Sequence, residues 1–141
     1  MHANLRKAIV ADPLRTVCWA QGAYYVVTGM WPLLHIDSFQ AVTGPKDDLW
    51  LVNTVGWLLI LVGAVLLLAA FRRTVGLEMA VLGIGSALVL AAVDIIYAMR
   101  DVISAIYLLD AVVEIAFAAA WVAGGLKSKW KTRKLAPRRS I

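Results

Sequence analysis

Residues 80–125 read AVLGIGSALVLAAVDIIYAMRDVISAIYLLDAVVEIAFAAAWVAGG, two long apolar runs separated by a short polar break at residues 98–102. At about 1.5 Å per residue, a helix in either run is long enough to cross the ~30 Å hydrocarbon core of a bilayer. Because the connection is short, we predict two adjacent antiparallel helices. Asp94, Asp110 and Glu114 interrupt these runs, where a membrane-spanning segment usually carries no charge.

The composition indicates that the protein folds within a lipid bilayer. Of the 141 residues, 62% are hydrophobic, and the mean hydropathy is +0.78. A soluble domain is only about half apolar and has no room to bury more. The length corresponds to one domain. Because Cys18 is the single cysteine, an intrachain disulfide and a cysteine-based metal site are both excluded.

Taken along its length, the chain predicts an all-α polytopic membrane protein built as a four-transmembrane-helix up-down bundle. We expect spans at about 16–36, 49–71, 75–98 and 102–126, an outer loop at 37–48, an N-terminal segment at 1–15 and a basic tail at 127–141. The first span is the least apolar, because its sequence includes Gln21, Tyr24, Tyr25, Thr28 and Pro32. A cleaved signal peptide is the alternative, but Trp31-Pro32 stands where small residues would be needed.

The distribution of basic residues predicts the orientation. Twelve of the fourteen Lys and Arg residues fall on one side of the predicted spans, and only Lys46 and Arg100 on the other. By the positive-inside rule, both termini should lie in the cytoplasm, with the protein in the bacterial cytoplasmic (inner) membrane. Trp19 and Trp121 are expected in the aromatic belt at the cytoplasmic boundary.

The basic tail is expected to act on the membrane surface. Its cations should be attracted to anionic lipid by about 1 kcal/mol each, and a membrane-tethered tail makes nucleic acid an improbable partner. The residues concerned are Lys127, Lys129, Lys131, Arg133, Lys134, Arg138 and Arg139.

Small residues at helical spacing predict which faces meet. On the third span they share a stripe with Asp94, so this carboxylate should point into the bundle and away from lipid. The first and second spans each offer two glycines seven residues apart, a separation that returns to the same face. These small residues are Gly76, Ala80, Gly83 and Ala87 on the third span, Gly22 and Gly29 on the first, and Gly56 and Gly63 on the second.

The three carboxylates should form a ladder that descends from the outer face. Asp110 and Glu114 are one helical turn apart, and Glu114 falls near the middle of the membrane. A charge placed there costs at least about 2.5–3.5 kcal/mol. We therefore expect Glu114 to be protonated, or to be compensated by Arg100, a bound cation or a partner protein.

Four roles fit this ladder. It could bind or shuttle cations or protons, bind a small amphipathic ligand such as a quinone or lipid, pair with a partner subunit or a second copy of the chain, or merely fix the order of the helices. We favour a non-enzymatic ligand-binding or accessory-subunit protein; the alternative is a small proton- or cation-coupled transporter using Asp110 and Glu114. The candidate ligand- or proton-binding residues are Asp94, Asp110, Glu114, Tyr107, Gln21 and Tyr25. No catalytic motif or cofactor signature is present, and His35 with Asp37 is too sparse a set to predict a metal site.

A resemblance supports the accessory-subunit interpretation. The pattern Gly22-x-x-Tyr25-x-x-x-Gly29-x-Trp31-Pro32-Leu33, followed by Thr43-Gly44-Pro45-Lys46 and Trp50-Leu51-Val52, resembles small uncharacterised bacterial four-helix membrane proteins. In size and helix number the chain also resembles the DoxX-like group. Some members of that group are small subunits of membrane oxidoreductase complexes, so the resemblance implies an interaction with a partner. It implies no functional residue.

Overall fold

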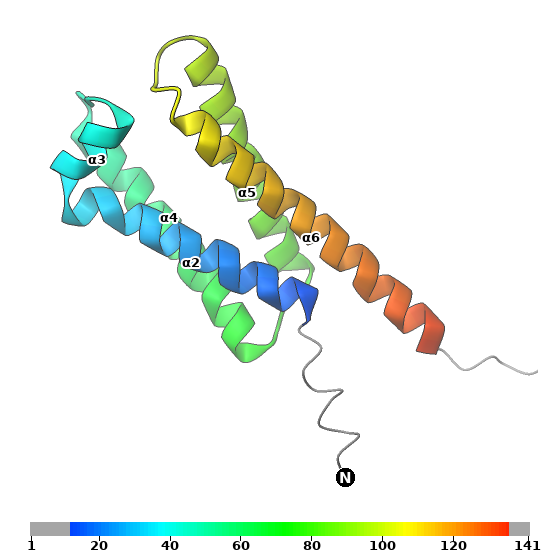
Figure 1. The fold of residues 1–141 in the computed structure, drawn as a ribbon. Coiled ribbons are helices and arrows are strands. Elements are labelled where there is room, and N and C mark those ends of the chain that lie inside the picture. Colours follow the sequence, from blue (N-terminus) through cyan, green and yellow to red (C-terminus); the bar gives the residue numbers. More distant parts are fainter. Residues whose placement is uncertain (1–11, 136–141) are drawn as a thin grey trace, which may run out of the picture.

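The computed structural model describes residues 12–135, with side chains to residue 127 (Figure 1). This part of the chain is entirely helical outside its connections. Its helices are α2 (Pro13–Leu34), α3 (Ile36–Thr43), α4 (Leu49–Arg72), α5 (Leu77–Met99) and α6 (Tyr107–Leu135). The prediction of an all-α protein is confirmed.

Three of these helices are long and apolar enough to cross a membrane: α4, α5 and residues Tyr107–Lys127 of α6. The chain is therefore a membrane protein, but the predicted four-transmembrane-helix bundle is wrong. The prediction that both termini lie in the cytoplasm relied on a fourth span, and the described residues offer three candidate spans.

The difference arises in α2, the predicted first span. Asp12 caps this helix by accepting a hydrogen bond from the Leu14 N–H, and Pro13 occupies the first turn, where no N–H is needed. The helix is 22 residues long, but its polar side chains lower its mean hydropathy, and it is not among the candidate spans. Gln21 and Tyr25 are fully buried, so these polar groups face the protein interior.

The helices pack as two pairs, α2 with α4 and α5 with α6. Glycines set the close approach of the first pair, as their spacing predicted. A Cβ on Gly22 would lie 2.9 Å from the Gly63 carbonyl oxygen, and one on Gly29 would lie 2.6 Å from that of Gly56. The earlier glycine of α2 meets the later glycine of α4, so the two helices are antiparallel.

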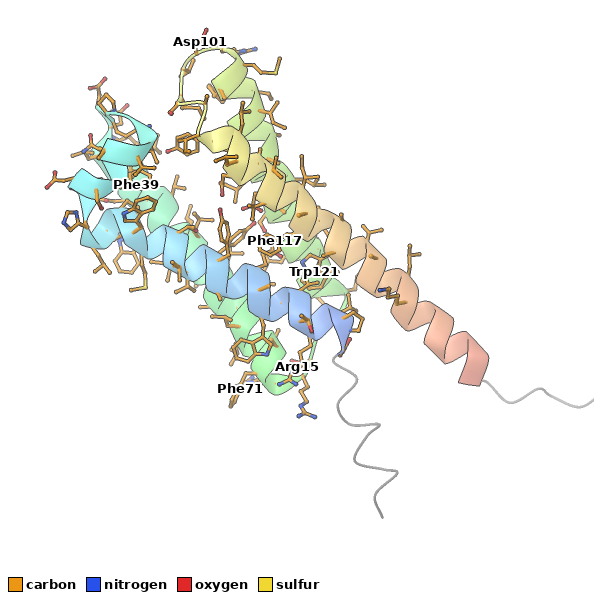
Figure 2. All side chains as sticks on the ribbon, viewed as in Figure 1. Arg15, Phe39, Phe71, Asp101, Phe117 and Trp121 are labelled. Carbon is orange, nitrogen blue, oxygen red and sulfur yellow. The ribbon has the colours of Figure 1, made fainter. Side chains whose placement is uncertain are left out.

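The two pairs converge at one end and separate toward α3 at the other (Figure 1). The converging end holds a hydrophobic core of Val17, Cys18, Leu66, Ala70 and Trp121. Trp121, labelled in Figure 2, is 2% exposed. Its predicted place in an interfacial aromatic belt is therefore wrong.

Several predicted boundaries need correction. Residues 37–48, expected as a loop, contain most of α3. The connection between α5 and α6 extends to residue 106, so the second helix of the pair begins later than the predicted residue 102. It also ends later, because α6 continues to Leu135 through the start of the predicted basic tail.

Basic residues gather at the converging end. The Arg15 guanidinium donates from Nε to the Ala70 carbonyl oxygen at 2.8 Å, beside Arg72 and Arg73 at the end of α4. Among the predicted membrane-surface cations, Lys127 is exposed. Lys129, Lys131, Arg133 and Lys134 belong to α6 without described side chains, and Arg138 and Arg139 lie outside the described residues.

Candidate functional site: a cavity with three carboxylates

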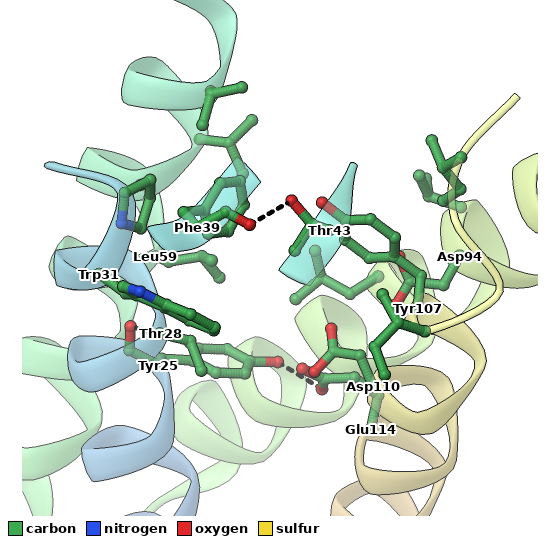
Figure 3. A pocket seen from close by; sticks show the side chains of 18 of the residues that line it. Tyr25, Thr28, Trp31, Phe39, Thr43, Leu59, Asp94, Tyr107, Asp110 and Glu114 are labelled. Carbon is green, nitrogen blue, oxygen red and sulfur yellow. Dashed lines mark hydrogen bonds between the residues drawn. The ribbon is translucent and has the colours of Figure 1, made fainter. Parts of the chain in front are cut away.

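A cavity of about 530 Å³ lies between the two helix pairs, on the side where they separate. Its walls come from the C-terminal half of α2, the first half of α4, the end of α5 and the start of α6, and α3 closes part of it (Figure 3). Most lining side chains are apolar, including Trp31, Phe39 and Leu59. Val55, Val93 and Leu109 line the cavity and remain 42%, 44% and 64% exposed, so this side is not sealed.

The polar part of the cavity is formed by the three carboxylates of the predicted ladder. Asp94 comes from α5, and Asp110 and Glu114 come from successive turns of α6. Asp94 shares the buried face of α5 with Gly83 and Ala87, as the small-residue stripe predicted. Glu114, seven residues after the start of α6, lies about 10 Å along that helix. Asp94 is 6% and Glu114 1% exposed.

A buried hydrogen-bond network holds Glu114 in place. The Tyr25 hydroxyl donates to Glu114 Oε2 at 2.8 Å and accepts from Gln21 Nε2 at 3.0 Å. Gln21 Nε2 also donates to the Gly83 carbonyl oxygen at 2.8 Å, and its Oε1 accepts from Trp121 Nε1 at 2.7 Å. Both polar atoms of the Gln21 side chain are therefore satisfied, and the network joins α2, α5 and α6.

The other two carboxylates are held differently. Tyr24 on α2 donates its hydroxyl proton to Asp110 Oδ1. The Asp94 carboxyl lies within hydrogen-bonding reach of Asp110, but its Oδ2 atom is buried without a partner among the described residues. Buried polar atoms in native structures are nearly always hydrogen-bonded, so this acceptor needs an explanation.

The lining of the cavity contains no Lys, Arg or His side chain among the described residues. The predicted compensation of the acids by Arg100 is not seen either, since the residues with described side chains form no ion pair with them. Lys46 contacts two lining residues: its Nζ lies 5.2 Å from the Tyr107 ring centroid and donates to the Thr43 carbonyl oxygen at 3.0 Å. Partial burial lowers the pKa of Lys46 below its usual value.

The structure brings together the residues singled out in the sequence. Asp94, Asp110, Glu114, Tyr107 and Tyr25 all line the cavity. Gln21 lies behind Tyr25, outside the lining, and acts as a support. No group of three or more His, Cys, Asp and Glu side chains within the described chain is arranged to hold a metal ion.

Tyr24, the partner of Asp110, was not among the site residues predicted from the sequence. A signal was present, because Gln21, Tyr24, Tyr25 and Thr28 recur at spacings of three and four and so form one polar face of α2. The contribution of α3, through Phe39 and Thr43, had no comparable signal.

Comparisons with known proteins found no match to a family model, to a curated protein or to a solved structure. The DoxX-like resemblance therefore stays a prediction. The geometry of the cavity is the basis on which a function can be assigned.

Proposed function

We propose that this protein binds a small amphipathic molecule in the cavity between its two helix pairs. The observation that supports this proposal is the cavity itself, about 530 Å³ of space with mostly apolar walls and one group of carboxylates. Ligand sites in proteins are commonly about 300–1,000 Å³, mainly apolar, with a few placed polar groups. A molecule with an apolar body and one polar group fits this description.

The position of the cavity favours a ligand that reaches it from the bilayer. The partly exposed lining residues Val55, Val93 and Leu109 are all apolar and belong to the three candidate spans. Lipid chains would surround these helices, so an amphipathic molecule dissolved in the membrane could enter between them without crossing a polar surface.

The alternative roles receive less support. A transporter needs a polar route out of the cavity on the far side, but the described network ends at Trp121, beside the apolar core of Val17, Cys18 and Leu66. A partner subunit that pairs with the acids needs them at the surface, but Asp94 and Glu114 are almost completely buried. We further propose the bacterial cytoplasmic membrane as the location, with the basic end near Arg72 and Arg73 inside.

Photoaffinity labelling of the full chain in liposomes tests the proposal. The probe is a neutral decanol that carries a diazirine on its alkyl chain, and the labelled residues are mapped by peptide mass spectrometry. We expect saturable labelling of cavity residues such as Leu59. Val113→Trp should abolish it, because Val113 lines the cavity and an indole would fill the space.

The matched control is Val112→Trp, one residue earlier, where the side chain is 64% exposed and outside the lining. This variant should label like the wild type. Equal labelling of the two variants, or labelling confined to outward-facing residues, would overturn the proposal. Leu59→Trp, from the opposite wall, replaces Val113→Trp if that variant does not fold.

A further inference from the structure

The carboxylates of the cavity offer more hydrogen-bond acceptors than the protein satisfies. Each of the hydroxyls of Tyr24 and Tyr25 has one proton, and these protons are directed at Asp110 and Glu114. Asp94 receives no tyrosine proton, and although its carboxyl reaches Asp110, its Oδ2 atom has no partner among the described residues while the side chain is 6% exposed and lines the cavity. The unpartnered oxygen of Asp94 therefore calls for a donor supplied from outside the chain.

The charge of the lining points in the same direction. Three carboxylates face one cavity, and its described lining contains no basic side chain. Isolated charges in the membrane interior are costly and are normally paired. A cationic group on the ligand would pair with these acids through charge-assisted hydrogen bonds, which are stronger than those between neutral groups.

Aromatic rings near the carboxylates suit such a group. Tyr24 and Tyr107 line the cavity, and an ammonium group is attracted to the face of an aromatic ring within about 6 Å. Lys46 already makes this contact with Tyr107, at 5.2 Å from the ring centroid, without joining the cavity lining. The surroundings of the cavity thus contain one example of an ammonium group held by a ring and a carbonyl oxygen.

We infer that the ligand is a lipophilic amine, whose protonated nitrogen donates to Asp94 and Asp110 while its apolar body occupies the space between Trp31, Phe39 and Leu59. This inference rests on the proposed function and specifies its ligand class. Figure 3 shows the arrangement, with the acids and Tyr107 on one side of the cavity and Trp31, Phe39 and Leu59 on the other. A quinone or other carbonyl compound needs donors instead, and the hydroxyl protons of Tyr24 and Tyr25 are engaged, which leaves Tyr107 as the one tyrosine of the described lining without an assigned acceptor.

Competition against the diazirine-decanol probe tests the inference. The competitors are decylamine, decanol and 2-decanone, which share an alkyl chain and differ in the polar end. The full chain is placed in phosphatidylcholine vesicles, because lipid without net charge does not concentrate the amine on the membrane electrostatically. We expect decylamine to displace the probe at a concentration about tenfold lower than decanol or 2-decanone, as a charged hydrogen bond to a buried acceptor implies.

Acid-to-amide variants locate the effect. Asp94→Asn should remove the advantage of decylamine over decanol. Asp101→Asn is the matched control, because this exposed acid lies on the α5–α6 connection outside the cavity lining. Asparagine also tolerates the positive φ of 55° at this position. Asp110→Asn serves as the second variant if Asp94→Asn does not fold.

The outcomes separate the two proposals. If the decanol probe labels the cavity but decylamine competes no better than decanol, the amine inference is overturned and the binding function stands. Stronger competition by 2-decanone would assign the ligand to the carbonyl class and equally overturn it. If the decanol probe itself shows no saturable labelling that depends on Val113, the binding function fails.

Discussion

The indole of Trp121 on α6 lies directly against Gly83 on α5, in space that any side chain at residue 83 would occupy. A Cβ added to Gly83 would lie 2.8 Å from Cζ2 of the indole and closer still to Cε2 and Nε1. From this position the indole donates to Gln21 at 2.7 Å. The missing side chain on α5 therefore allows the contact that closes the bundle below the cavity.

Gly83→Ala should destabilise the protein by about 1–3 kcal/mol, the usual cost of overpacking a core. The methyl group would displace Trp121 and with it the hydrogen bond to Gln21. The measurement is thermal unfolding in detergent, followed by circular dichroism. Gly85→Ala is the control, since no atom lies within 4 Å of a Cβ at Gly85. An equal loss of stability in both variants would show that the effect comes from replacing any glycine in this helix and not from the contact with the indole.

Gln21 should act as a structural link between three helices. Gln21→Leu leaves Trp121 Nε1 without its acceptor and removes the hydrogen bond to the Gly83 carbonyl oxygen, and a buried unsatisfied group costs about 1–3 kcal/mol. Trp121→Phe removes the indole N–H alone. In a double-mutant cycle of unfolding free energies, the combined variant should lose less than the sum of the single variants. Simple additivity would indicate that the two side chains do not interact.

The sequence was sufficient to predict α4 and α5, because each is one long apolar run with clear ends. It also predicted that Asp94 points inward, because small residues share its face and only that face can approach another helix closely. Likewise, the glycine spacing on α2 and α4 reflects backbone approach, which depends little on the rest of the fold.

The errors concern residues whose role depends on tertiary contacts. A tryptophan near a helix end suits an interfacial belt as well as a core, and the position of α2 decides which environment surrounds Trp121. The polar residues of α2 made it the least apolar of the predicted spans, and two of them, Gln21 and Tyr25, lie on its buried face. The cavity arises from the divergence of two helix pairs, a feature that no local pattern encodes.

The glycine contacts between α2 and α4 should be sensitive to a single methyl group. Gly29→Ala places a Cβ 2.6 Å from the Gly56 carbonyl oxygen, which belongs to backbone and cannot rotate away. We expect a loss of about 1–3 kcal/mol in unfolding free energy. Gly125→Ala is the control, because its Cβ would meet no atom within 4 Å. Wild-type stability of Gly29→Ala would mean that the two helices lie further apart than described.

Glu114→Gln should leave the folded protein as stable as the wild type or more so at pH 7. Glutamine keeps an acceptor for the Tyr25 hydroxyl, now 2.8 Å from Glu114 Oε2, and removes an ionisable group that is 1% exposed. Glu114→Leu removes the acceptor as well and should cost about 1–3 kcal/mol. Thermal unfolding distinguishes the two Glu114 variants. Glu78→Gln is the control, because Glu78 is exposed. Strong destabilisation by Glu114→Gln would instead reveal a charged, paired carboxylate.

The ammonium of Lys46 should make stability depend on pH in the alkaline range. Burial lowers its pKa from the usual 10.5, so the folded protein releases this proton at a lower pH than the unfolded chain. Between the two pKa values the unfolded state binds more protons, and stability therefore rises with pH. The melting temperature of the wild type relative to Lys46→Met should thus increase as pH approaches 10.5. The comparison with Lys46→Met removes the contribution of tyrosine ionisation, which both proteins share. A relative melting temperature that falls with pH would show that the contacts with Tyr107 and Thr43 stabilise the charge more than burial opposes it.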